Sequence, residues 1–352
     1  MATSHITIND VTLMNTGGPP GTTIPEDSAK AMNLKRRDFI GLKDFSKTEL
    51  EALLDLAAAM KAGQNTEKYL QDKLLGMLFT VASTRTRISF QVGAQHLGGH
   101  AEHYNAADLQ LSNRETLKDT AAVMSRFLDA IIVRMYDMSS YGQGRDGLNT
   151  IAEHADVPVI NALDDKEHPC QVMADILTLK EKFGPDYKQK RVVMSWGYSP
   201  RQKSLGVLHS MLVSGSMLGM NLIFAHPKGY DLDEEYLSFA RSQLKESGGT
   251  LEFTNDLMEA AEGADVIYMK SWKSLTLPKE REEIFKNEIR ADWCVSEEHF
   301  QRANPGAYYM DCMPFVRGEQ VTAGVADGHN SIIYDQAENR LHAQKSIMAA
   351  II

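Results

Sequence analysis

Short apolar runs alternate with stretches of helical spacing along most of the chain. The run Leu74–Val81 is typical of a buried strand, and the apolar residues Ile88, Val92 and Leu97 that follow it keep the spacing of one helix face. From residue 190 the alternation continues, with strands expected at 191–196, 221–225, 251–254 and 265–269 and helices expected at 205–218, 233–246 and 256–262. This pattern predicts an α/β fold of two doubly wound parallel-sheet domains joined by helices.

Further elements are predicted where capping residues accompany the apolar pattern. Ser46 and Glu49 form a capping box at the start of one helix. Pro169 suits the first turn of a helix that runs to about residue 183, which leaves His168 at or near its N-cap. The other expected elements are a helix over 116–127, strands over 130–133 and 157–162, and a last helix over 336–350.

Composition and charge narrow the class of protein. Of the 352 residues, 43% are hydrophobic and 24% are charged, as in globular enzymes, and the net charge of -10 argues against nucleic acid or a membrane surface as a partner. The three cysteines, Cys170, Cys294 and Cys312, have no C-x-x-C spacing, which favours a reducing compartment. Because the first ten residues lack the apolar core of a signal peptide and no apolar run approaches about 18 residues, we expect a cytoplasmic protein.

The turn Ser83–Arg87, where the first predicted strand becomes a helix, is the richest group of hydrogen-bond donors. The first amides of a helix have no partner within the helix, and the positive end of its dipole lies there. Two arginines and three hydroxyls on these five residues suit a doubly charged oxyanion such as phosphate. An N-cap serine followed by solvated arginines would explain a lone S-x-R, but five consecutive donor-bearing residues favour an anion site.

Three more hydrogen-bonding sites fall at or near predicted element ends. Arg134 ends a buried strand, where ligands of α/β domains usually bind, although a solvated strand end explains it equally well. His168 lies at a positive helix N-terminus, which disfavours the imidazolium, so we expect a neutral hydrogen-bonding imidazole with Gln171 beside it. A lone histidine in this position is more often a cap than a catalyst. Arg340 lies on the last predicted helix.

The signatures of other enzyme classes are missing from the sequence. The strand at 191–196 runs into Ser195–Pro200 without a G-x-G-x-x-G turn, and H-E-x-x-H, G-x-S-x-G and P-loop motifs are absent as well. We therefore expect no cofactor and no metal. Arginines that neutralise a leaving phosphate and a neutral histidine that polarises a carbonyl oxygen suit a phosphorylated substrate. A nucleotide- or dinucleotide-binding oxidoreductase that uses the second domain remains the alternative from another class.

Three motifs at these places resemble those of the aspartate/ornithine carbamoyltransferase family. They are Ser83-Thr84-Arg85-Thr86-Arg87, His168-Pro169-Cys170-Gln171 and Glu338-Asn339-Arg340-Leu341-His342-Ala343-Gln344-Lys345. The resemblance covers the chain from about residue 36 to the end. It implies an enzyme of amino-acid and nitrogen metabolism that moves the carbamoyl group of carbamoyl phosphate to an amino or ureido nitrogen of a small acceptor. It also implies a homotrimer with active sites at the subunit interfaces.

The resemblance further implies a division into domains and a set of site residues. Residues 37–167 plus 336–352 would bind carbamoyl phosphate, 168–335 would bind the acceptor, and 1–36 would form an N-terminal arm. The residues implied to bind carbamoyl phosphate are Ser83, Thr84, Arg85, Thr86, Arg134, His168, Gln171, Cys312, Met313 and Arg340. Those implied to be catalytic are Arg85, Arg134, His168, Gln171 and Cys312. The loop Asp108–Glu115 is implied to reach into the active site of a neighbouring subunit.

The acceptor half departs from the family pattern. Ornithine enzymes carry Ser-Met-Gly where this chain has Lys270-Ser271-Trp272, and the usual His-Cys-Leu-Pro is Asp311-Cys312-Met313-Pro314 here. Lys-Ser-Trp and the proline-bearing loop 199–203 resemble the knotted branch, which includes N-acetylornithine, N-succinylornithine and ureidoglycine-type catabolic carbamoyltransferases. That resemblance implies a trefoil knot in the C-terminal domain. The acceptor-binding candidates are Asn161, Asp165, Lys270, Trp272 and Asp311. Because of Asp311, a non-catalytic relative that binds carbamoyl phosphate or an acidic metabolite is a further alternative.

Overall fold

Residue 34 is the first residue that the structure describes, and it already belongs to the folded body. The computed structural model describes residues 34–105, 107 and 109–352, so most of the expected arm and Asp108 lie outside the described part. Leu34 is buried, and the amide of Arg36 donates to the carbonyl of Ile351 at 2.8 Å. Residues 34–36 therefore pack against the body rather than continuing the arm. No helix in the described ranges has the length and apolar character needed to cross a membrane.

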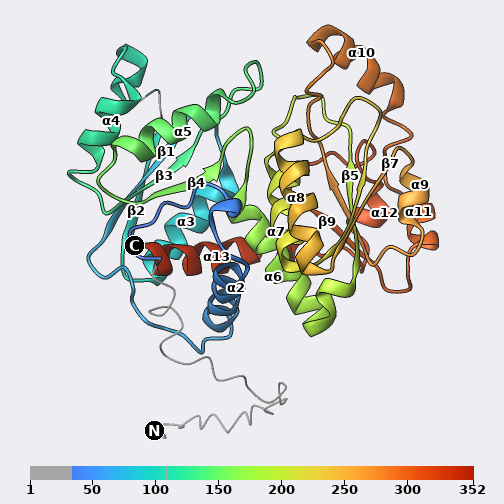
Figure 1. Ribbon diagram of the computed structural model, residues 1–352, viewed down its shortest axis with the longest axis horizontal. Helices are drawn as coiled ribbons and strands as arrows, with labels where there is room; N and C mark the ends of the chain where they lie inside the picture. The colour runs from blue at the N-terminus through green and yellow to red at the C-terminus, as the bar shows by residue number, and fades with distance from the viewer. Residues whose placement is uncertain (1–33, 106, 108) are drawn as a thin grey trace, which may run out of the picture.

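The first domain contains a four-stranded parallel sheet in the order β2-β1-β3-β4 (Figure 1). Its strands are β1 (Leu74–Phe79), β2 (His100–Asn105), β3 (Ala130–Arg134) and β4 (Val159–Leu163). Its helical segments are η1 (Leu42–Asp44), α2 (Lys47–Lys61), α3 (Thr84–His96), η3 (Gln110–Asn113), α4 (Leu117–Met124) and α5 (Gln143–His154). Alternate residues of a strand face opposite sides, so Met77 packs in the large core with α2 and α3, while Leu78 packs in a second cluster with α4 and α5.

The second domain contains a five-stranded parallel sheet in the order β7-β6-β5-β8-β9. Its strands are β5 (Arg191–Trp196), β6 (Asn221–Ala225), β7 (Thr250–Thr254), β8 (Val266–Lys270) and β9 (Tyr308–Asp311). Its helical segments are α7 (Gly206–Leu218), α8 (Glu234–Ser247), α9 (Leu257–Ala261), α10 (Lys279–Ile289), α11 (Glu297–Arg302) and α12 (Ala323–Ala326). In Figure 1, α7 and α8 face the first domain, while α9, α11 and α12 cover the outer side of the sheet.

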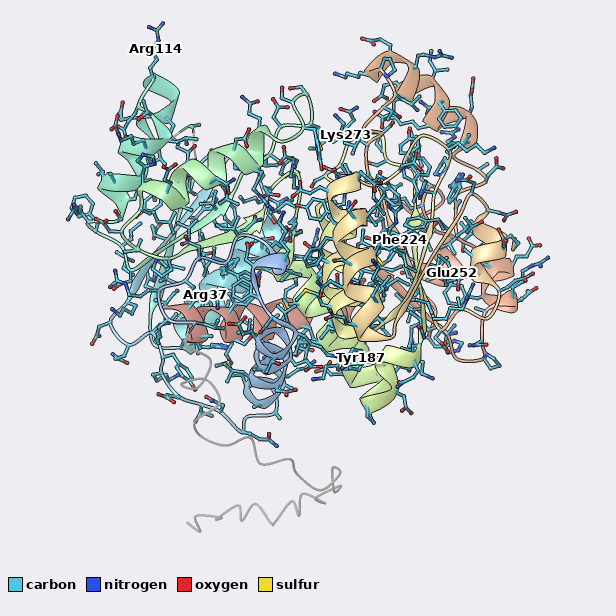
Figure 2. The ribbon with its side chains drawn as sticks, in the orientation of Figure 1. Arg37, Arg114, Tyr187, Phe224, Glu252 and Lys273 are labelled. Atoms are coloured by element: carbon cyan, nitrogen blue, oxygen red, sulfur yellow. The ribbon has the colours of Figure 1, made fainter. Side chains whose placement is uncertain are left out.

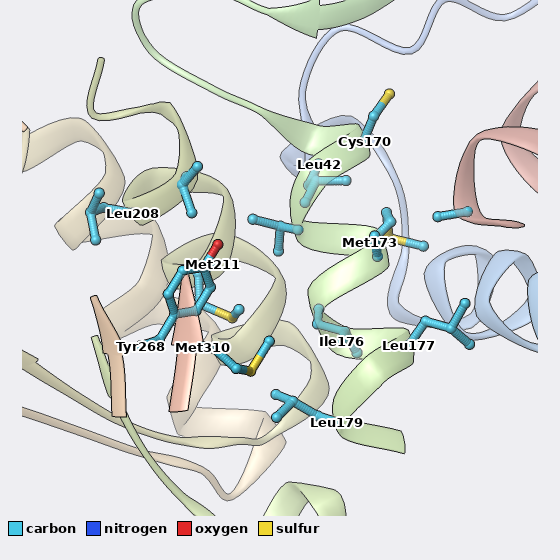
Figure 3. Close-up of a cluster of buried hydrophobic side chains, with 14 of the residues drawn as sticks. Leu42, Cys170, Met173, Ile176, Leu177, Leu179, Leu208, Met211, Tyr268 and Met310 are labelled. Atoms are coloured by element: carbon cyan, nitrogen blue, oxygen red, sulfur yellow. The ribbon is translucent and has the colours of Figure 1, made fainter. Parts of the chain in front are cut away.

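Two long helices join the domains: α6 (Pro169–Phe183), which continues into η4 (Gly184–Gln189), and α13 (Ile333–Ile351). α6 packs against α13 and α2 on one side and against α7 on the other. Figure 3 shows its Met173 and Ile176 among side chains that include Leu42 of the first domain and Met211 of the second. One apolar core thus runs through both domains. At the edge of the boundary, the Lys273 ammonium donates to the Met138 carbonyl at 2.7 Å (Figure 2).

The two parallel-sheet domains confirm the predicted fold class, and the differences from the prediction have simple causes. β2, with the sequence His-Ala-Glu-His-Tyr-Asn, is an edge strand with exposed side chains, so it lacks the apolar run by which β1 was found. α5, α10 and α11 were also missed; α10 buries only Glu282 and Lys286, which leaves little apolar periodicity. The first predicted strand ends at Phe79, and Val81 belongs to the loop that follows. The trefoil knot stays a prediction.

Candidate active site

The carboxyl ends of both sheets open onto one cavity. In each sheet the strand order reverses beside a central strand, and a crevice forms where the neighbouring connections leave in opposite directions. These places are the ends of β1 and β3 in the first domain and of β5 and β8 in the second. The cavity has a volume of about 480 Å³. Its lining is Val81, Ala82, Ser83, Thr84, Arg85, Thr86, Arg134, Tyr136, Leu163, His168, Gln171, Arg201, Gln202, Lys203, Ser204, Val207, Lys270, Ser271, Asp311, Cys312, Met313, Pro314, Gln320 and Arg340.

The turn between β1 and α3 presents the start of a helix to this cavity. Ser83 is the N-cap of α3, and its hydroxyl accepts the Thr86 amide at 3.4 Å. Val81 and Ala82 line the cavity beside this helix start, which leaves the first turn of α3 facing inward. Arg87 points the other way, since it is exposed and absent from the lining. The predicted anion site is thus residues 83–86, without the second arginine.

A buried hydrogen-bond network fixes the side of the cavity that α3, α6 and α13 form. The guanidinium of Arg340 donates to the Thr86 hydroxyl at 2.8 Å and to the Gln171 side-chain oxygen at 2.5 Å. The amide groups of Gln171 and Gln336 both donate to one oxygen of Asp175, at 2.8 and 2.7 Å. Burial raises the pKa of Asp175 to about 6 despite these bonds. Because both partners of each bond are buried, the network holds α3, α6 and α13 in one arrangement.

His168 is held by its backbone and leaves its ring free. Its amide donates to the Gly206 carbonyl and to the Ser210 hydroxyl, both at 3.0 Å. A Cβ on Gly206 would come within 2.7 Å of the Glu167 carbonyl carbon, so only glycine allows this approach of α7 to the start of α6. Burial, followed by the charges of Arg340 and Arg134, lowers the pKa of His168 well below its usual value. The imidazole is therefore neutral at physiological pH, as the sequence predicted.

Arg134 occupies the end of β3, where the sequence placed it. It is about 9% exposed, its Nε donates to the Val81 carbonyl at 3.2 Å, and its guanidinium lies 5.6 Å from the centre of the Tyr136 ring. Burial lowers its pKa. The single backbone contact orients the guanidinium and leaves most of its donors for a ligand.

The loop after β9 forms a wall of the cavity on the side of the second domain. One oxygen of Asp311 accepts the Met313 amide at 2.6 Å, and the Asp311 amide donates to Gln336 at 3.1 Å. Met313 has a φ of 55°, a left-handed conformation that a methionine seldom adopts, so the loop is strongly constrained. Burial raises the pKa of the Cys312 thiol, which is therefore protonated at neutral pH.

The cavity gathers cations that form no ion pair with the described residues. Within the described part of the chain, none of Arg85, Arg134, Lys203, Lys270 or Arg340 lies within 4.0 Å of a carboxylate oxygen. Burial, followed by the charge of Lys270, lowers the pKa of Lys203. Converging positive charges without counterions are costly unless a ligand supplies the negative charge. The cavity is therefore built for anions.

Three of the acceptor-binding candidates do not line the cavity. Asn161 donates to the Ile40 carbonyl, and Asp165 accepts backbone amides at the start of α5, including that of Gly144. Both side chains thus bond to backbone groups and hold the segment that precedes His168 in place. Trp272 is buried and donates to the Tyr230 carbonyl at 2.8 Å, so it packs in the second domain. Asn161 lies within β4, whose side chains point alternately to opposite faces of the sheet. Asp165 and Trp272 lie just past the ends of β4 and β8, where the path of the loop decides the direction of the side chain.

Several lining residues were not predicted as site residues. Arg201 and Lys203 follow β5, and their position after the strand where the order reverses was a signal for binding. Tyr136 follows β3 in the same way. Gln320 comes from the segment between β9 and α12, and its side chain lies 3.2 Å from the position that a Cβ on Gly197 would take. Nothing in the sequence around Gln320 indicates that contact.

Both halves of the chain match models of one protein family. Residues 37–181 match the aspartate/ornithine carbamoyltransferase carbamoyl-P binding domain, and residues 202–351 match the aspartate/ornithine carbamoyltransferase Asp/Orn binding domain. The first model contains the turn at residues 83–86, and the second contains Asp311 and Arg340. The two domains that enclose the cavity are therefore the two domains of this family.

Individual relatives agree. The chain is 40% identical to an ornithine carbamoyltransferase of Pyrococcus abyssi over 91% of its length and 97% of the relative's. It is 42% identical to the ornithine carbamoyltransferase of Symbiobacterium thermophilum over 91% of its own length and 99% of the relative's. Among solved structures, ornithine carbamoyltransferase from Pyrococcus furiosus matches at a TM-score of 0.79 and 39% identity, over 90% of this chain and 97% of the other. Acetylornithine transcarbamylase complexed with acetylcitrulline matches at a TM-score of 0.84 and 34% identity, over 90% of this chain and 99% of the other. The chain belongs to the aspartate/ornithine carbamoyltransferase family.

Proposed function

We propose that this enzyme transfers the carbamoyl group of carbamoyl phosphate to a nitrogen of an ornithine-type acceptor and releases phosphate. The observation that carries the proposal is the cavity in which arginines and lysines converge around a helix N-terminus and form no ion pair with the residues that the structure describes. The family assignment removes the dinucleotide-binding alternative and identifies carbamoyl phosphate as the anionic donor.

The donor half of the cavity suits carbamoyl phosphate. The phosphate would lie at the start of α3, with Ser83, Thr84, Arg85 and Thr86 as donors, because backbone amides and a helix dipole meet it there. Arg134 and the neutral His168 would donate to the carbonyl oxygen, which gains negative charge as the nitrogen attacks. Arg340 holds Gln171 and Thr86 and joins these two groups.

The acceptor would enter from the second domain. Lys203 and Lys270 line that side and suit the carboxylate of an ornithine-type acceptor, and Gln320 offers an amide. The relatives named above act on ornithine or acetylornithine. Ornithine, N-acylated ornithines and ureido compounds of the ureidoglycine type form the test set, since the Lys-Ser-Trp stretch is shared with the knotted branch.

A homotrimer in the cytoplasm completes the proposal. The segment that ends at Arg114 lies at the outer end of the first domain (Figure 2), which suits a loop that reaches a neighbouring subunit. Exposed apolar side chains on α3 and beside α4, Ile88 at 54% and Phe127 at 74%, support an interface there. Three free cysteines support a reducing compartment.

Phosphate release from carbamoyl phosphate, measured with each acceptor of the set, tests the function. We expect turnover with at least one acceptor, and a rise in melting temperature when carbamoyl phosphate alone is added. A rise in melting temperature without turnover on any acceptor would identify the non-catalytic relative instead. Absence of both effects would refute the proposal.

A further inference from the structure

Asp311 holds a carboxylate oxygen that the structure leaves free. Its Oδ1 accepts the Met313 amide, whereas the buried Oδ2 has no hydrogen-bond partner among the described residues. The side chain is about 2% exposed and belongs to the cavity lining. Among the described residues that line the cavity, Asp311 is the one with an acidic side chain. A buried carboxylate oxygen without a partner is costly, and at the wall of a ligand cavity the ligand can supply the missing donor.

The surroundings of Asp311 fit a group that gains and loses a proton. Lys270 on β8, Lys203 after β5 and Arg85 on α3 favour its charged form, while Tyr268, Tyr309 and Cys312 are the other titratable groups around it. Burial outweighs these cations and raises the pKa of Asp311 to about 7. A base works best when its pKa lies near the working pH.

The other carboxylate close to the cavity is already occupied. Asp175 accepts from Gln171, Gln336 and the Tyr268 hydroxyl, so both of its oxygens are engaged. Burial, followed by the charges of neighbouring cations, lowers the pKa of His168 and keeps it neutral. Lys203 is the remaining rival for a proton-accepting role, because burial and neighbouring cations lower its pKa.

We propose that Asp311 receives the proton of the attacking nitrogen: its free Oδ2 binds an N–H of the acceptor nitrogen and takes one proton before that nitrogen bonds to the carbamoyl carbon. This inference rests on the proposed carbamoyl transfer and adds a catalytic role within it. It also defines the acceptor group, which is a nitrogen that carries at least one hydrogen and binds best as a cation.

The protons and electrons balance for a primary ammonium acceptor. The first proton passes from nitrogen to Oδ2 of Asp311, which frees the lone pair that attacks the carbamoyl carbon. The bond between that carbon and the phosphate oxygen then breaks, and its electron pair stays on phosphate. The leaving phosphate takes the second proton of the nitrogen, and Asp311 returns its proton to solvent after the product leaves.

The test compares Asp311→Asn with the wild-type enzyme and with Asp327→Asn, an exposed aspartate of the same domain that serves as the matched control. Asparagine keeps the shape and can still accept the Met313 amide, but it cannot take a proton. We expect kcat to fall about 100-fold or more. The acid limb of the kcat/KM profile, near pH 7 in the wild type, should disappear, while the melting-temperature rise caused by carbamoyl phosphate persists.

Several outcomes would contradict the proposed role of Asp311. A wild-type rate in Asp311→Asn, or an acid limb that persists there and vanishes in Lys203→Met, would assign the proton to another group. Loss of the carbamoyl-phosphate effect in Asp311→Asn would place the residue in the donor half. If Asp311→Asn does not fold, Asp311→Glu replaces it, and an acid limb that stays unchanged in that variant contradicts the proposal. Failure of the wild-type enzyme on every acceptor is a separate result and refutes the function itself.

Discussion

The two halves of the cavity are built differently. On the donor side, Thr86, Arg340, Gln171 and Asp175 already bond to one another, and the ligand completes an existing arrangement. On the acceptor side, the buried Oδ2 of Asp311 has no hydrogen-bond partner among the described residues, and the Lys270 ammonium donates to the neighbouring Ser271 carbonyl rather than to another lining side chain. The donor side is preorganised by hydrogen bonds between its own side chains, whereas on the acceptor side the ligand must supply the missing hydrogen-bond partner.

The difference follows from what each half must recognise. Carbamoyl phosphate is the same molecule for every member of such a family, so a fixed set of donors serves it. An acceptor varies among relatives, and a few side chains at loop positions can change it without disturbing the sheets. Gln336 links the two halves, because it donates to Asp175 and accepts the amide of Asp311.

The largest effect is expected from breaking the donor side at Arg85. Arg85→Ala should weaken carbamoyl-phosphate binding by about 3 kcal/mol or more, because the phosphate loses a charged partner inside a cavity. The melting-temperature rise at a fixed carbamoyl-phosphate concentration measures it. Arg87→Ala is the matched control, since Arg87 is exposed and outside the lining. Equal loss in both variants would contradict the assignment of the phosphate to this turn.

A change at His168 should separate binding from catalysis. His168→Asn removes the imidazole that would stabilise charge on the carbonyl oxygen, so we expect kcat to fall roughly 100- to 1000-fold while carbamoyl phosphate still stabilises the protein. Because the wild-type pKa is well below its usual value, kcat should show no histidine titration between about pH 6 and 8. A clear His168-dependent change of kcat in that pH range would show that the imidazole titrates there, and would contradict its proposed role as a neutral donor to the carbonyl oxygen.

The pH dependence of stability should sharpen the contrast at Asp311. Its folded pKa of about 7 exceeds the usual 3.8, so the unfolded chain ionises first and the folded state loses stability as pH rises from about 4 to 7. Asp311→Asn removes that loss. We therefore expect the melting temperature of the variant minus that of the wild type to increase over this range and then to level off. A constant difference would mean that Asp311 has an ordinary pKa.

The smallest effect is expected from Lys203→Met on the acceptor side. Loss of one cation should raise the acceptor KM about 10-fold, which corresponds to roughly 1.4 kcal/mol, and should leave carbamoyl-phosphate stabilisation unchanged. Initial rates at varied acceptor concentration measure it. Lys273→Met is the control, since Lys273 follows β8 but donates to Met138 outside the lining. A weaker stabilisation by carbamoyl phosphate, with an unchanged acceptor KM, would place Lys203 on the donor side of the cavity.

The sequence predicted the donor half well and the acceptor half poorly. Ser83 to Thr86, Arg134, His168 and Gln171 were found because each lies at an element boundary that caps, prolines or strand ends make visible. Asn161, Asp165 and Trp272 were placed wrongly in relation to the cavity, because the side to which a side chain points depends on packing. Arg201, Lys203 and Gln320 were missed among the site residues.

By itself, the sequence determined the alternation of strands and helices and the position of the donor-rich turn at residues 83–86, since these depend on spacing and on capping residues. Tertiary structure alone decided that α13 brings Arg340 to Thr86 and Gln171, 254 and 169 residues away along the chain. It also decided that Asp311 is buried with a free oxygen. Such long-range contacts arise from how the sheets and helices pack, and no local pattern of residues encodes them.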